Sequence, residues 1–424
     1  PIEEYQKLGL LPKDLYPKEI ITRGTPGWSL KEFSRELENS TIFTVDMTSA
    51  TRATNHAIIL ENTGTAIIAD PWVVINGRGS WFDVDSMVAE ICGHETDPRK
   101  KAFLIWLFLK QNRYHWYPAE VGNEIHSPVK FINIYGCGFC DDSATNAELL
   151  FKSAGLSQAR VWGLNGHVVP EVFYNGAWHM LDPDLEVFYP EWDNLTVAGV
   201  EALAADGPLI RRISDSYIEG LYTTTNNNFT YTNHWDAAFT MAMSLRPQER
   251  LERYWTNWGK YHDNNQKQKP WRLGNGRLVY APIILAPHFP QGLEEFNNLK
   301  AIPGDETTTT ALFQDNPSLP GRLTCYMKSS YVFVGGTVGM DIRLEGNEDS
   351  ILLEYSRNQT SWETVMSWQG PFSGAVSPPL DDFIKPLLLS ACYEFHVRVT
   401  LQGGGGASLE RLEVTGEVQL APTA

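Results

Sequence analysis

The chain has 424 residues, a formal net charge of −17 and 42% hydrophobic residues, a globular composition that is long enough for two or three domains. The acidic balance argues against nucleic acid as a partner, because the excess of Lys and Arg that would neutralise phosphate is missing. No uncharged apolar stretch reaches the length of about 18 residues that a spanning helix needs, so we expect a soluble protein without membrane insertion. The sequence makes no prediction of an oligomeric state.

The N-terminal part of the chain is predicted to be an arm followed by a small β unit, together covering residues 1–80. The first 40 residues are polar and rich in Pro, with a short helix expected near Leu30–Leu37. Short β-type runs follow up to Asn76, interrupted by an Asn62-Thr-Gly64 turn. The chain begins at Pro1 without Met, which fits either removal of a signal peptide or a trimmed sequence, and we expect a secreted or periplasmic protein.

Two buried helices are predicted in the next part of the chain. Asp97 as cap and Pro98 as first helical residue begin an apolar run that continues to Lys110. A second helix is predicted over Cys140–Ala154, because its apolar residues form one stripe and Gly155 follows as a stop.

Three strands are predicted after the second helix, and the order helix, strand, hairpin indicates an α+β fold. They cover Ala159–Leu164, His167–Tyr174 and Ala177–Leu181. Asn175-Gly176 predicts a two-residue hairpin turn, and strand pairing placed symmetrically about it puts Asp182 opposite Val169. Asp182 then becomes a diagonal neighbour of His167 on the same face of the hairpin.

The rest of the chain is predicted to be an extension of the core followed by a β module. Helices are expected near Val197–Ala204 and Gln248–Trp258, which would complete a catalytic core over residues 81–300. Residues 301–310 combine Pro, Gly and a run of Thr and are the predicted linker. Short alternating runs over residues 311–424 predict an all-β sandwich, with Gly403–Gly406 as the tip of a hairpin.

The strongest chemical signal is a thiol at the start of the second helix. Free backbone N–H groups and the positive end of the helix dipole would stabilise a thiolate at Cys140. Asp141 and Asp142 in the same turn oppose that effect, so an activating imidazolium is needed, and His167 is the candidate. With Asp182 to orient the imidazole, the residues predict a catalytic triad that uses neither a metal ion nor a cofactor.

These motifs resemble the transglutaminase-like core of the papain-like cysteine enzymes. The resemblance covers roughly residues 95–190. It rests on the runs Gly138-x-Cys140-x-Asp142, Gly166-His167-Val-Val-Pro170 and Trp178-x-x-x-Asp182-Pro183. It implies that Cys140 is the nucleophile, His167 the acid and base, and Asp182 its orienting carboxylate. The helix at 97–113 is also similar to the helix that precedes the nucleophile in that family.

The chain departs from the family pattern after the catalytic His. Family members usually carry an aromatic residue two positions after it, whereas this chain has Val169 followed by Pro170, which lacks a ladder N–H. Besides the backbone N–H of Cys140, the candidates to complete an oxyanion hole are Tyr135 and Trp162.

We therefore expect a transglutaminase-like, papain-type core with a small N-terminal β unit and a C-terminal β-sandwich. The expected activity is acyl transfer, or amide or peptide hydrolysis, through a thioester on Cys140. The substrate would be a peptide or protein.

A polysaccharide-active enzyme, a uronate lyase or a glycosidase, is the alternative on the same scaffold. It would use a cleft of aromatic, His and Tyr side chains, with an Arg to neutralise a uronate carboxylate. The candidate substrate-binding residues are Arg113, Tyr114, His115, Trp116, Trp162, His234, Trp235, Tyr261 and His262. The same rings could simply be packed with satisfied polar tips. A further alternative is a binding protein that retains the triad as a relic. Trp362 and Trp368 are candidate ligand contacts in the C-terminal sandwich, where packing at the sheet edge is the simpler account.

The five Cys residues leave alternatives open. Cys137-x-x-Cys140 could be a redox pair or half of a zinc site, although no second Cys pair is near it. Cys137 could otherwise be a core residue or a partner that caps Cys140 as a regulatory disulfide. Cys325 and Cys392 are either buried or, in an exported protein, paired.

Overall fold

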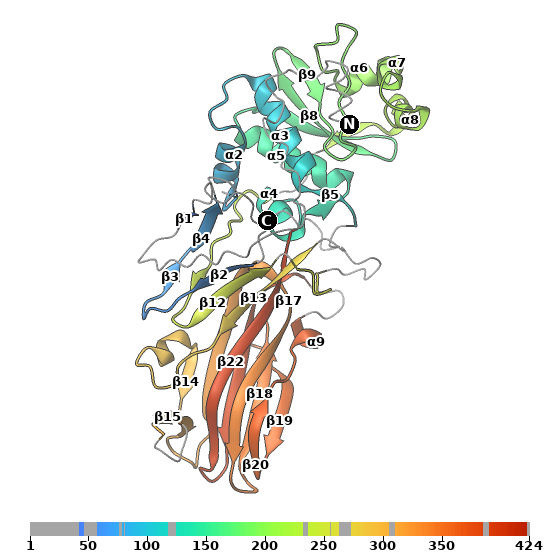
Figure 1. Ribbon diagram of the computed structural model, residues 1–424. Coiled ribbons are helices and arrows are strands. Elements are labelled where there is room, and N and C mark those ends of the chain that lie inside the picture. Colours follow the sequence, from blue (N-terminus) through green and yellow to red (C-terminus); the bar gives the residue numbers. More distant parts are fainter. Residues whose placement is uncertain are drawn as a thin grey trace, which may run out of the picture.

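The computed structural model divides the molecule into a helical part around a small sheet and a part made of long strands (Figure 1). It describes residues 42–45, 57–75, 79, 81–117, 124–231, 236–254, 256–262, 273–304, 310–384 and 390–421. The predicted N-terminal arm, with its helix near Leu30–Leu37, lies outside these residues. Helices and strands together make an α+β fold, as the sequence predicts.

The helices lie mainly between residues 84 and 223. They are α2 (Val84–Cys92), α3 (Pro98–Asn112), α4 (Pro128–Lys130), the π-helix η2 (Phe131–Tyr135), α5 (Cys140–Ser153), α6 (Val200–Ala205), α7 (Pro208–Arg211), α8 (Ser216–Thr223) and the short 3-10 helix η3 (Thr225–Asn227).

Local capping chemistry determines where α3 and α5 begin and end. The Asp97 side chain accepts hydrogen bonds from the N–H groups of Arg99 and Lys100, and Pro98 occupies the first turn of α3. Helix α5 ends before Gly155, whose φ of +87° lies in the left-handed region that Gly adopts without strain. Both predicted helices are confirmed.

A four-stranded antiparallel sheet carries the predicted hairpin. Its order is β10 (Phe229–Tyr231), β7 (Ala159–Gly163), β8 (Val168–Tyr174), β9 (Ala177–Met180). Glu171 pairs with Met180 and Val172 with His179, which is the register predicted from Asn175-Gly176. The three predicted strands and their pairing are confirmed.

This sheet has a hydrophobic layer on each face. Leu150 and Phe151 of α5 belong to the same buried cluster as Val172 of β8. Val169 of β8, on the other face, packs in a second cluster with Leu203 of α6. Because side chains alternate along a strand, β8 contributes to both layers, and the sheet lies between α5 and α6–α8.

The strand-rich part is built on one large sheet. Its strands are β2 (Ala57–Glu61), β12 (Glu249–Tyr254), β13 (Gly274–Tyr280), β14 (Glu295–Asn297), β15 (Leu299–Ile302), β16 (Ala311–Gln314), β17 (Gly321–Leu344), β18 (Ser350–Ser356), β19 (Glu363–Gln369), β20 (Phe372–Val376), β21 (Cys392–Gln402) and β22 (Ala407–Leu420). Two short helices, η4 (Phe289–Gly292) and α9 (Asp381–Ile384), flank it. The large antiparallel sheet is consistent with the predicted β-sandwich.

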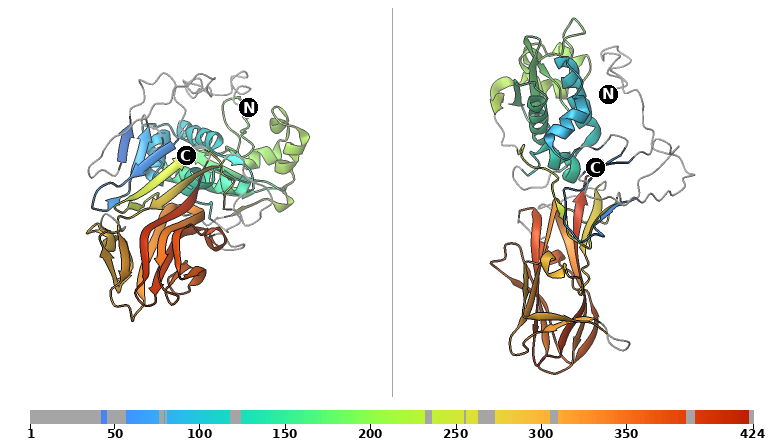
Figure 2. Two further views of the ribbon diagram at one scale, coloured as in Figure 1. Left: turned by 60° about the horizontal axis from the view of Figure 1, so that its bottom comes forward. Right: turned by 90° about the vertical axis from the view of Figure 1, so that its left-hand side faces the viewer.

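The long strand β17 allows this sheet to fold over into two layers (Figure 2). Its first half pairs with β21 and its second half with β22, with register shifts near Phe333. In the described sheet β21 and β22 pair with different stretches of β17 and are not neighbours. The predicted hairpin at Gly403–Gly406 is therefore wrong: these residues connect strands that are separated by β17.

The predicted helix over Gln248–Trp258 is also wrong, because this region holds strand β12. Its Glu and Arg residues are good helix formers, but β2 pairs with one edge of β12 and β13 with the other. Gln248 also has a φ of +59°, which no helix accommodates. The predicted helix near Val197–Ala204 is confirmed as α6.

Several N-terminal strands pair with distant parts of the chain. β3 (Ile68–Ala69) pairs with β11 (Ser244–Leu245), and β2 joins the large sheet through β12. β1 (Ile42–Val45) and β4 (Trp72–Ile75) pair with each other in parallel. On either side of the expected linker, β15 and β16 also pair with each other. The division of the chain into domains stays a prediction.

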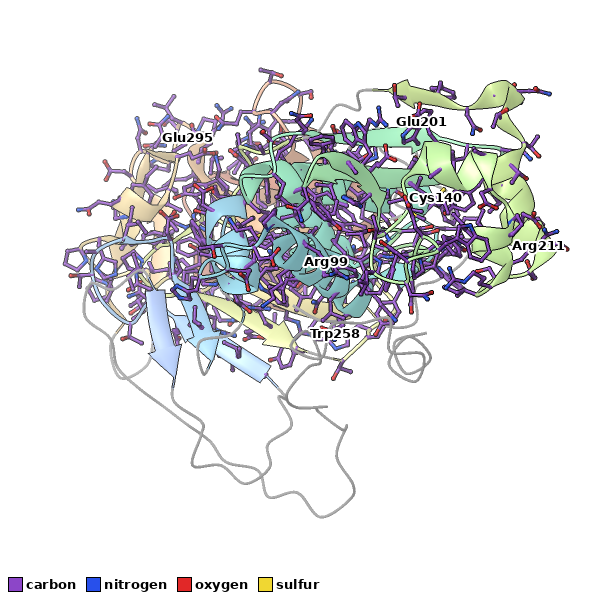
Figure 3. The ribbon with its side chains drawn as sticks, turned by 90° about the horizontal axis from the view of Figure 1, so that it is seen from above. Arg99, Cys140, Glu201, Arg211, Trp258 and Glu295 are labelled. Carbon is purple, nitrogen blue, oxygen red and sulfur yellow. The ribbon has the colours of Figure 1, made fainter. Side chains whose placement is uncertain are left out.

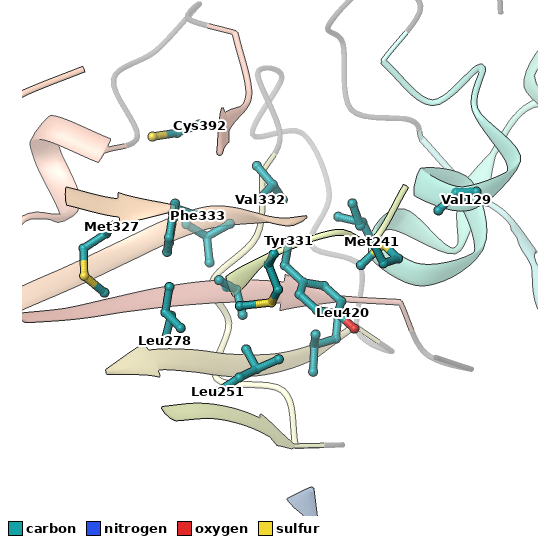
Figure 4. Packing of buried hydrophobic residues seen from close by; sticks show 14 of the residues in the cluster. Val129, Met241, Leu251, Leu278, Met327, Tyr331, Val332, Phe333, Cys392 and Leu420 are labelled. Atoms are coloured by element: carbon teal, nitrogen blue, oxygen red, sulfur yellow. The ribbon is translucent and has the colours of Figure 1, made fainter. Parts of the chain in front are cut away.

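The two parts of the molecule share a continuous core. Viewed from above, Cys140 lies in the helical part and Glu295 in the strand-rich part (Figure 3). One buried cluster contains Val129 of α4, Met241, and Tyr331 of β17 (Figure 4).

Hydrogen bonds add to this apolar contact between the two parts. The Gln419 side chain of β22 donates to the Ile134 carbonyl of η2 at 3.0 Å. Tyr135 and Tyr393 both donate to the Glu124 carboxylate, which also pairs with Lys130. The end of β22 and β21 are thus attached to the segment that leads into Cys140.

Candidate active site

Cys140 is the first residue of α5, and its thiol is half-buried. The preceding Gly136 has a φ of +62°, which allows the chain to turn from η2 into the short strand β6 (Cys137–Gly138). Asp142 accepts the N–H of Phe139 at 2.8 Å, and its other oxygen lies 3.1 Å from Nε2 of His126. One of the two acidic neighbours of Cys140 is therefore engaged in local contacts.

The imidazole of His167 is hydrogen-bonded to a fully buried carboxylate. His167 Nε2 lies 2.7 Å from Asp182 Oδ2. The other oxygen, Asp182 Oδ1, accepts the N–H groups of Asp184 at 2.7 Å and Leu185 at 3.1 Å. These contacts hold the carboxylate in one orientation, and it can hold the imidazole in turn.

The charge of Asp182 changes the protonation of His167. Burial acts to lower the pKa of His167, but the Asp182 charge and hydrogen bond, with contributions from Cys140, raise it from 6.5 to about 10. His167 therefore carries a proton at neutral pH. A cation beside Cys140 is the arrangement that stabilises a thiolate.

A second carboxylate, which the sequence reasoning missed, also adjoins the thiol. Cys140 Sγ, a ring nitrogen of His167 and a carboxylate oxygen of Asp184 all lie within 4.8 Å of one another. Asp184 Oδ1 binds Nη1 of Arg113 at 2.7 Å and Nδ1 of His115 at 2.9 Å. The signal that could have found it is the spacing Asp182-Pro183-Asp184, with a second acid two positions after the orienting one.

The contacts of Asp184 keep it ionised. Burial acts to raise the pKa of Asp184, but the hydrogen bond from His115 and the charges of Arg113, His115 and His167 lower it overall. The Arg113 guanidinium is buried and also donates to the Pro183 carbonyl. Asp184 is therefore a fixed negative charge beside the thiol.

Two of the predicted substrate-binding residues thus lie beside the triad. Arg113 follows α3, and His115 belongs to β5 (Tyr114–His115), which pairs in parallel with β6. Tyr114 lies opposite Cys137 in this pairing, and Trp116 donates its backbone N–H to Gly138 at 3.3 Å. The β5–β6 contact is what brings residues 113–116 close to the nucleophile.

Trp162 and Tyr135 give their polar hydrogens to carboxylates outside the triad. Trp162 Nε1 donates to Glu171 at 2.8 Å, and the Arg160 side chain binds the same oxygen at 2.6 Å. The Tyr135 hydroxyl donates to Glu124 at 3.2 Å. The polar hydrogens of both rings are thus donated to carboxylates, and the assignment of either ring to an oxyanion hole stays a prediction.

The remaining predicted substrate-binding residues are separate from the triad or outside the described residues. Tyr261 and His262 are buried, and the His262 backbone N–H donates to the Gln419 side chain of β22 at 2.7 Å. They therefore lie at the contact with the strand-rich part. His234 and Trp235 lie outside the described residues.

All five Cys residues are within the described ranges, and none of them is in a disulfide. Cys137 is buried, and its Sγ is 3.8 Å from the Tyr117 carbonyl oxygen. Cys325 and Cys392 are buried in the strand-rich part, which agrees with the packing alternative.

Three groups of side chains in the described part of the chain have the spacing to hold a metal ion. They are Cys140, His167, Asp184; His126, Asp141, Asp142; and Glu294, Glu394, His396. Each group contains a carboxylate that already has a protein partner, such as Arg113 for Asp184 and His126 for Asp142. We therefore assign the first group to thiol chemistry and propose no metal site.

Comparison with known families relates the region around the triad to a known superfamily. Residues 85–183 match the model of the transglutaminase-like superfamily. This segment is a transglutaminase-like region. It contains Cys140, His167 and Asp182, and at a coarse level the match supports an enzyme of the cysteine type.

Other comparisons add no argument about function. No curated protein matches the chain. The family 29 carbohydrate-binding module CBM29_1 from Piromyces equi is similar at 13% identity, covering 34% of this chain and 90% of its own, with a TM-score of 0.22. The C-terminal domain of a chitobiase from Bacteroides fragilis is similar at 14% identity, covering 29% and 91%, with a TM-score of 0.20. TM-scores this low carry no argument about the present chain.

Among the described helices, none has the length and apolar character needed to cross a bilayer.

Proposed function

We propose that this protein is a cysteine-dependent enzyme that hydrolyses an amide or peptide, or transfers its acyl group, through a thioester on Cys140. The observation that carries the proposal is the grouping of the Cys140 thiol with the His167 imidazole, which is bound at 2.7 Å to the buried Asp182. The papain-type arrangement of the core is part of the same proposal.

In the proposed acylation the two ring nitrogens of His167 have different partners. Because Nε2 of His167 is bound to Asp182, the other ring nitrogen, Nδ1, is left to face Cys140. The thiol proton is held by His167, and the Cys140 thiolate attacks the substrate carbonyl carbon. His167 then gives its proton to the leaving amine, and the thioester remains on Cys140.

The start of α5 contributes to the same step. The backbone N–H of Cys140 is in the first turn of the helix, where it has no partner within the helix. It can donate to the oxygen that becomes negative when the thiolate adds to the carbonyl. Water or an amine then accepts the acyl group, and we propose water as the principal acceptor.

Selective alkylation tests the nucleophile. We expect mild iodoacetamide to modify Cys140 before the other four thiols, as read by intact mass and peptide mapping. Cys140→Ala should remove the fast reaction, and His167→Gln should slow it at least about 10-fold, because the thiolate loses its counter-charge. The matched control is Cys137→Ser, which should keep the fast reaction. An unreactive Cys140 in the folded parent protein would overturn the proposal.

The geometry favours no second function. A uronate lyase would need an Arg whose guanidinium can reach the substrate carboxylate. The Arg113 side chain is only 2% exposed, and Asp184, with an equally buried side chain, already neutralises it. A peptide or protein substrate and export from the cell are the predictions that we retain with the proposal.

A further inference from the structure

The chain reaches Cys140 through a π-helix, a rare helix type that often occurs at functional sites. Helix α4 and η2 are continuous, and the last turn is wider than an α-turn: the Gly136 N–H donates to the Phe131 carbonyl, five positions before it, at 2.6 Å. Cys140 follows Gly136 by four positions. A change in this wide turn is therefore passed directly to the nucleophile.

The end of β22 binds the last carbonyl groups of η2, which a helix leaves without partners of its own. The Gln419 side chain donates to the Ile134 carbonyl at 3.0 Å, across 285 positions of sequence. Just after β22, the Ala421 backbone N–H donates to the Asn133 carbonyl at 2.9 Å. The strand-rich part thus caps the π-helix that precedes the nucleophile.

Gln419 is itself held in one orientation. It is buried, and its side-chain oxygen accepts the His262 backbone N–H at 2.7 Å while its nitrogen donates to Ile134. Turning the amide over would break both hydrogen bonds in a place with little access to water, which is costly. The contact with η2 is therefore a fixed one.

The helical part holds the next residues of the same segment. The carbonyl groups of Gly136 and Gly138 accept the N–H groups of Tyr114 at 2.9 Å and Trp116 at 3.3 Å. The strand-rich part thus fixes η2, and β5 fixes β6. Cys140 begins α5 directly after these two sets of contacts.

Loss of the contact with β22 would let the wide turn tighten into an α-turn. Each residue of an α-helix adds a rotation of about 100° and a rise of about 1.5 Å, so removing the extra residue re-aims the segment that follows. Acyl transfer tolerates little displacement, since an error of about 1 Å can cost about 100-fold in rate.

We propose that Gln419 is a positioning residue of the active site: through η2 it holds Cys140 where His167 can pair with the thiol. This inference rests on the proposed function. It makes the end of β22 a part of the catalytic unit, although it contributes no atom to the reaction.

Alkylation of Cys140 by iodoacetamide measures this positioning. Gln419→Met keeps the length of the side chain and removes both hydrogen bonds. We expect its rate at pH 7 to fall at least about 10-fold below that of the parent, because a thiol without a paired imidazolium is only about 3% ionised there. At about pH 9 the two rates should agree within about 2-fold, since the thiol then ionises without help.

Gln314→Met is the matched control. Gln314 is also buried in the strand-rich part and donates to a backbone carbonyl, that of Leu319, at 2.6 Å. It lies on β16, which pairs with β22 near the end away from η2. We expect this variant to lose stability and yet to keep the parental alkylation rate and pH profile within about 2-fold, because the contact that it breaks is remote from η2. Both variants are measured at a temperature where urea unfolding shows them to be folded.

Gln419→Glu adds a rescue by a conservative change. At about pH 5 the new carboxyl is protonated, because burial raises the pKa of a carboxyl above its ordinary value of about 4.3. It can then donate to Ile134 and accept from His262, so its alkylation rate should be within about 2-fold of that of the parent. Gln419→Met should remain slow at the same pH.

The outcomes separate this inference from the proposed function. If Cys140 of the folded parent does not react, the proposed function fails. If the parent reacts and folded Gln419→Met reacts equally fast, only the role of Gln419 is overturned. Equal slowing in Gln314→Met, or a Gln419→Glu that stays slow at pH 5, overturns it too. Should Gln419→Met fail to fold, Gln419→Glu decides: its rate relative to the parent must fall between about pH 5 and 7.5 as the carboxyl ionises, and a constant ratio rejects the role.

Discussion

The indole nitrogen of Trp106 donates a 2.8 Å hydrogen bond to the backbone carbonyl oxygen of Asp182, across 76 positions of sequence. Trp106 is buried in α3, where its ring packs edge-on against Phe188 at 5.5 Å. The helix before the nucleophile thus supports the backbone of the residue that orients His167. This link connects stability of the core to the chemistry of the site.

Replacing Trp106 with Phe removes that hydrogen bond while keeping an aromatic ring. We expect the free energy of unfolding to fall by about 2–3 kcal/mol, because the Asp182 carbonyl loses its donor and a small void remains. Alkylation of Cys140 should slow as well. Trp192→Phe is the matched control: Trp192 is 61% exposed and donates to Asp206 at the surface, so it should change stability by less than about 0.5 kcal/mol. Equal losses in urea unfolding of the two variants would contradict this account.

The His167–Asp182 pair predicts a pH dependence of stability with a definite sign. The pKa of His167 rises from 6.5 to about 10 on folding, so the folded state binds a proton more tightly than the unfolded state. Its contribution is complete below about pH 6.5 and is lost as the pH rises through about 10. We expect the difference in unfolding free energy between the parent and His167→Gln to shrink over this range. A difference that stays constant or grows with pH in urea titrations would refute the assignment.

Local chemistry explains which elements could be predicted from the sequence. The Asp97-Pro98 cap and the Asn175-Gly176 turn each act within a few residues. Their effects can therefore be predicted from the sequence without knowledge of the fold. The turn register then carries over to the strands, which is why the closeness of His167 and Asp182 could be predicted.

Long-range pairing explains what could not be predicted. Strand β12 looks helical by composition, and only its partners β2 and β13 decide otherwise. Arg113 and Asp184 are 71 positions apart, so the sequence identified Arg113 as a candidate but not the carboxylate that neutralises it. Asp184 was missed for that reason.

A buried ion pair near the start of β12 should be costly to break. Arg246 Nη2 lies 2.8 Å from Glu249 Oε1, and the side chains are 0% and 3% exposed. Glu249→Gln leaves the guanidinium charge without its partner, and we expect unfolding free energy to fall by about 3–5 kcal/mol. The exposed pair Lys300–Asp315 gives the control, since Asp315→Asn should cost less than about 1 kcal/mol. Similar midpoints for both variants in urea would contradict the prediction.

Glu171 offers a way to test whether Trp162 serves the fold or the substrate. Its carboxylate accepts hydrogen bonds from Trp162 at 2.8 Å and from the backbone N–H of Val200 at 2.7 Å, and it pairs with Arg160. It thereby joins β7 and β8 to α6, on the face of the sheet opposite α5.

We expect Glu171→Gln to lower the free energy of unfolding by about 2–4 kcal/mol, because buried donors lose a charged acceptor. At a temperature where the variant is folded, its Cys140 should react with iodoacetamide at close to the parental rate, since the contact supports the sheet and not the triad. Glu363→Gln, at an exposed position of β19, should alter neither quantity. If Glu171→Gln leaves stability intact but slows acylation of Cys140, the Trp162–Glu171 contact belongs to the substrate site, and the structural role argued for it is wrong.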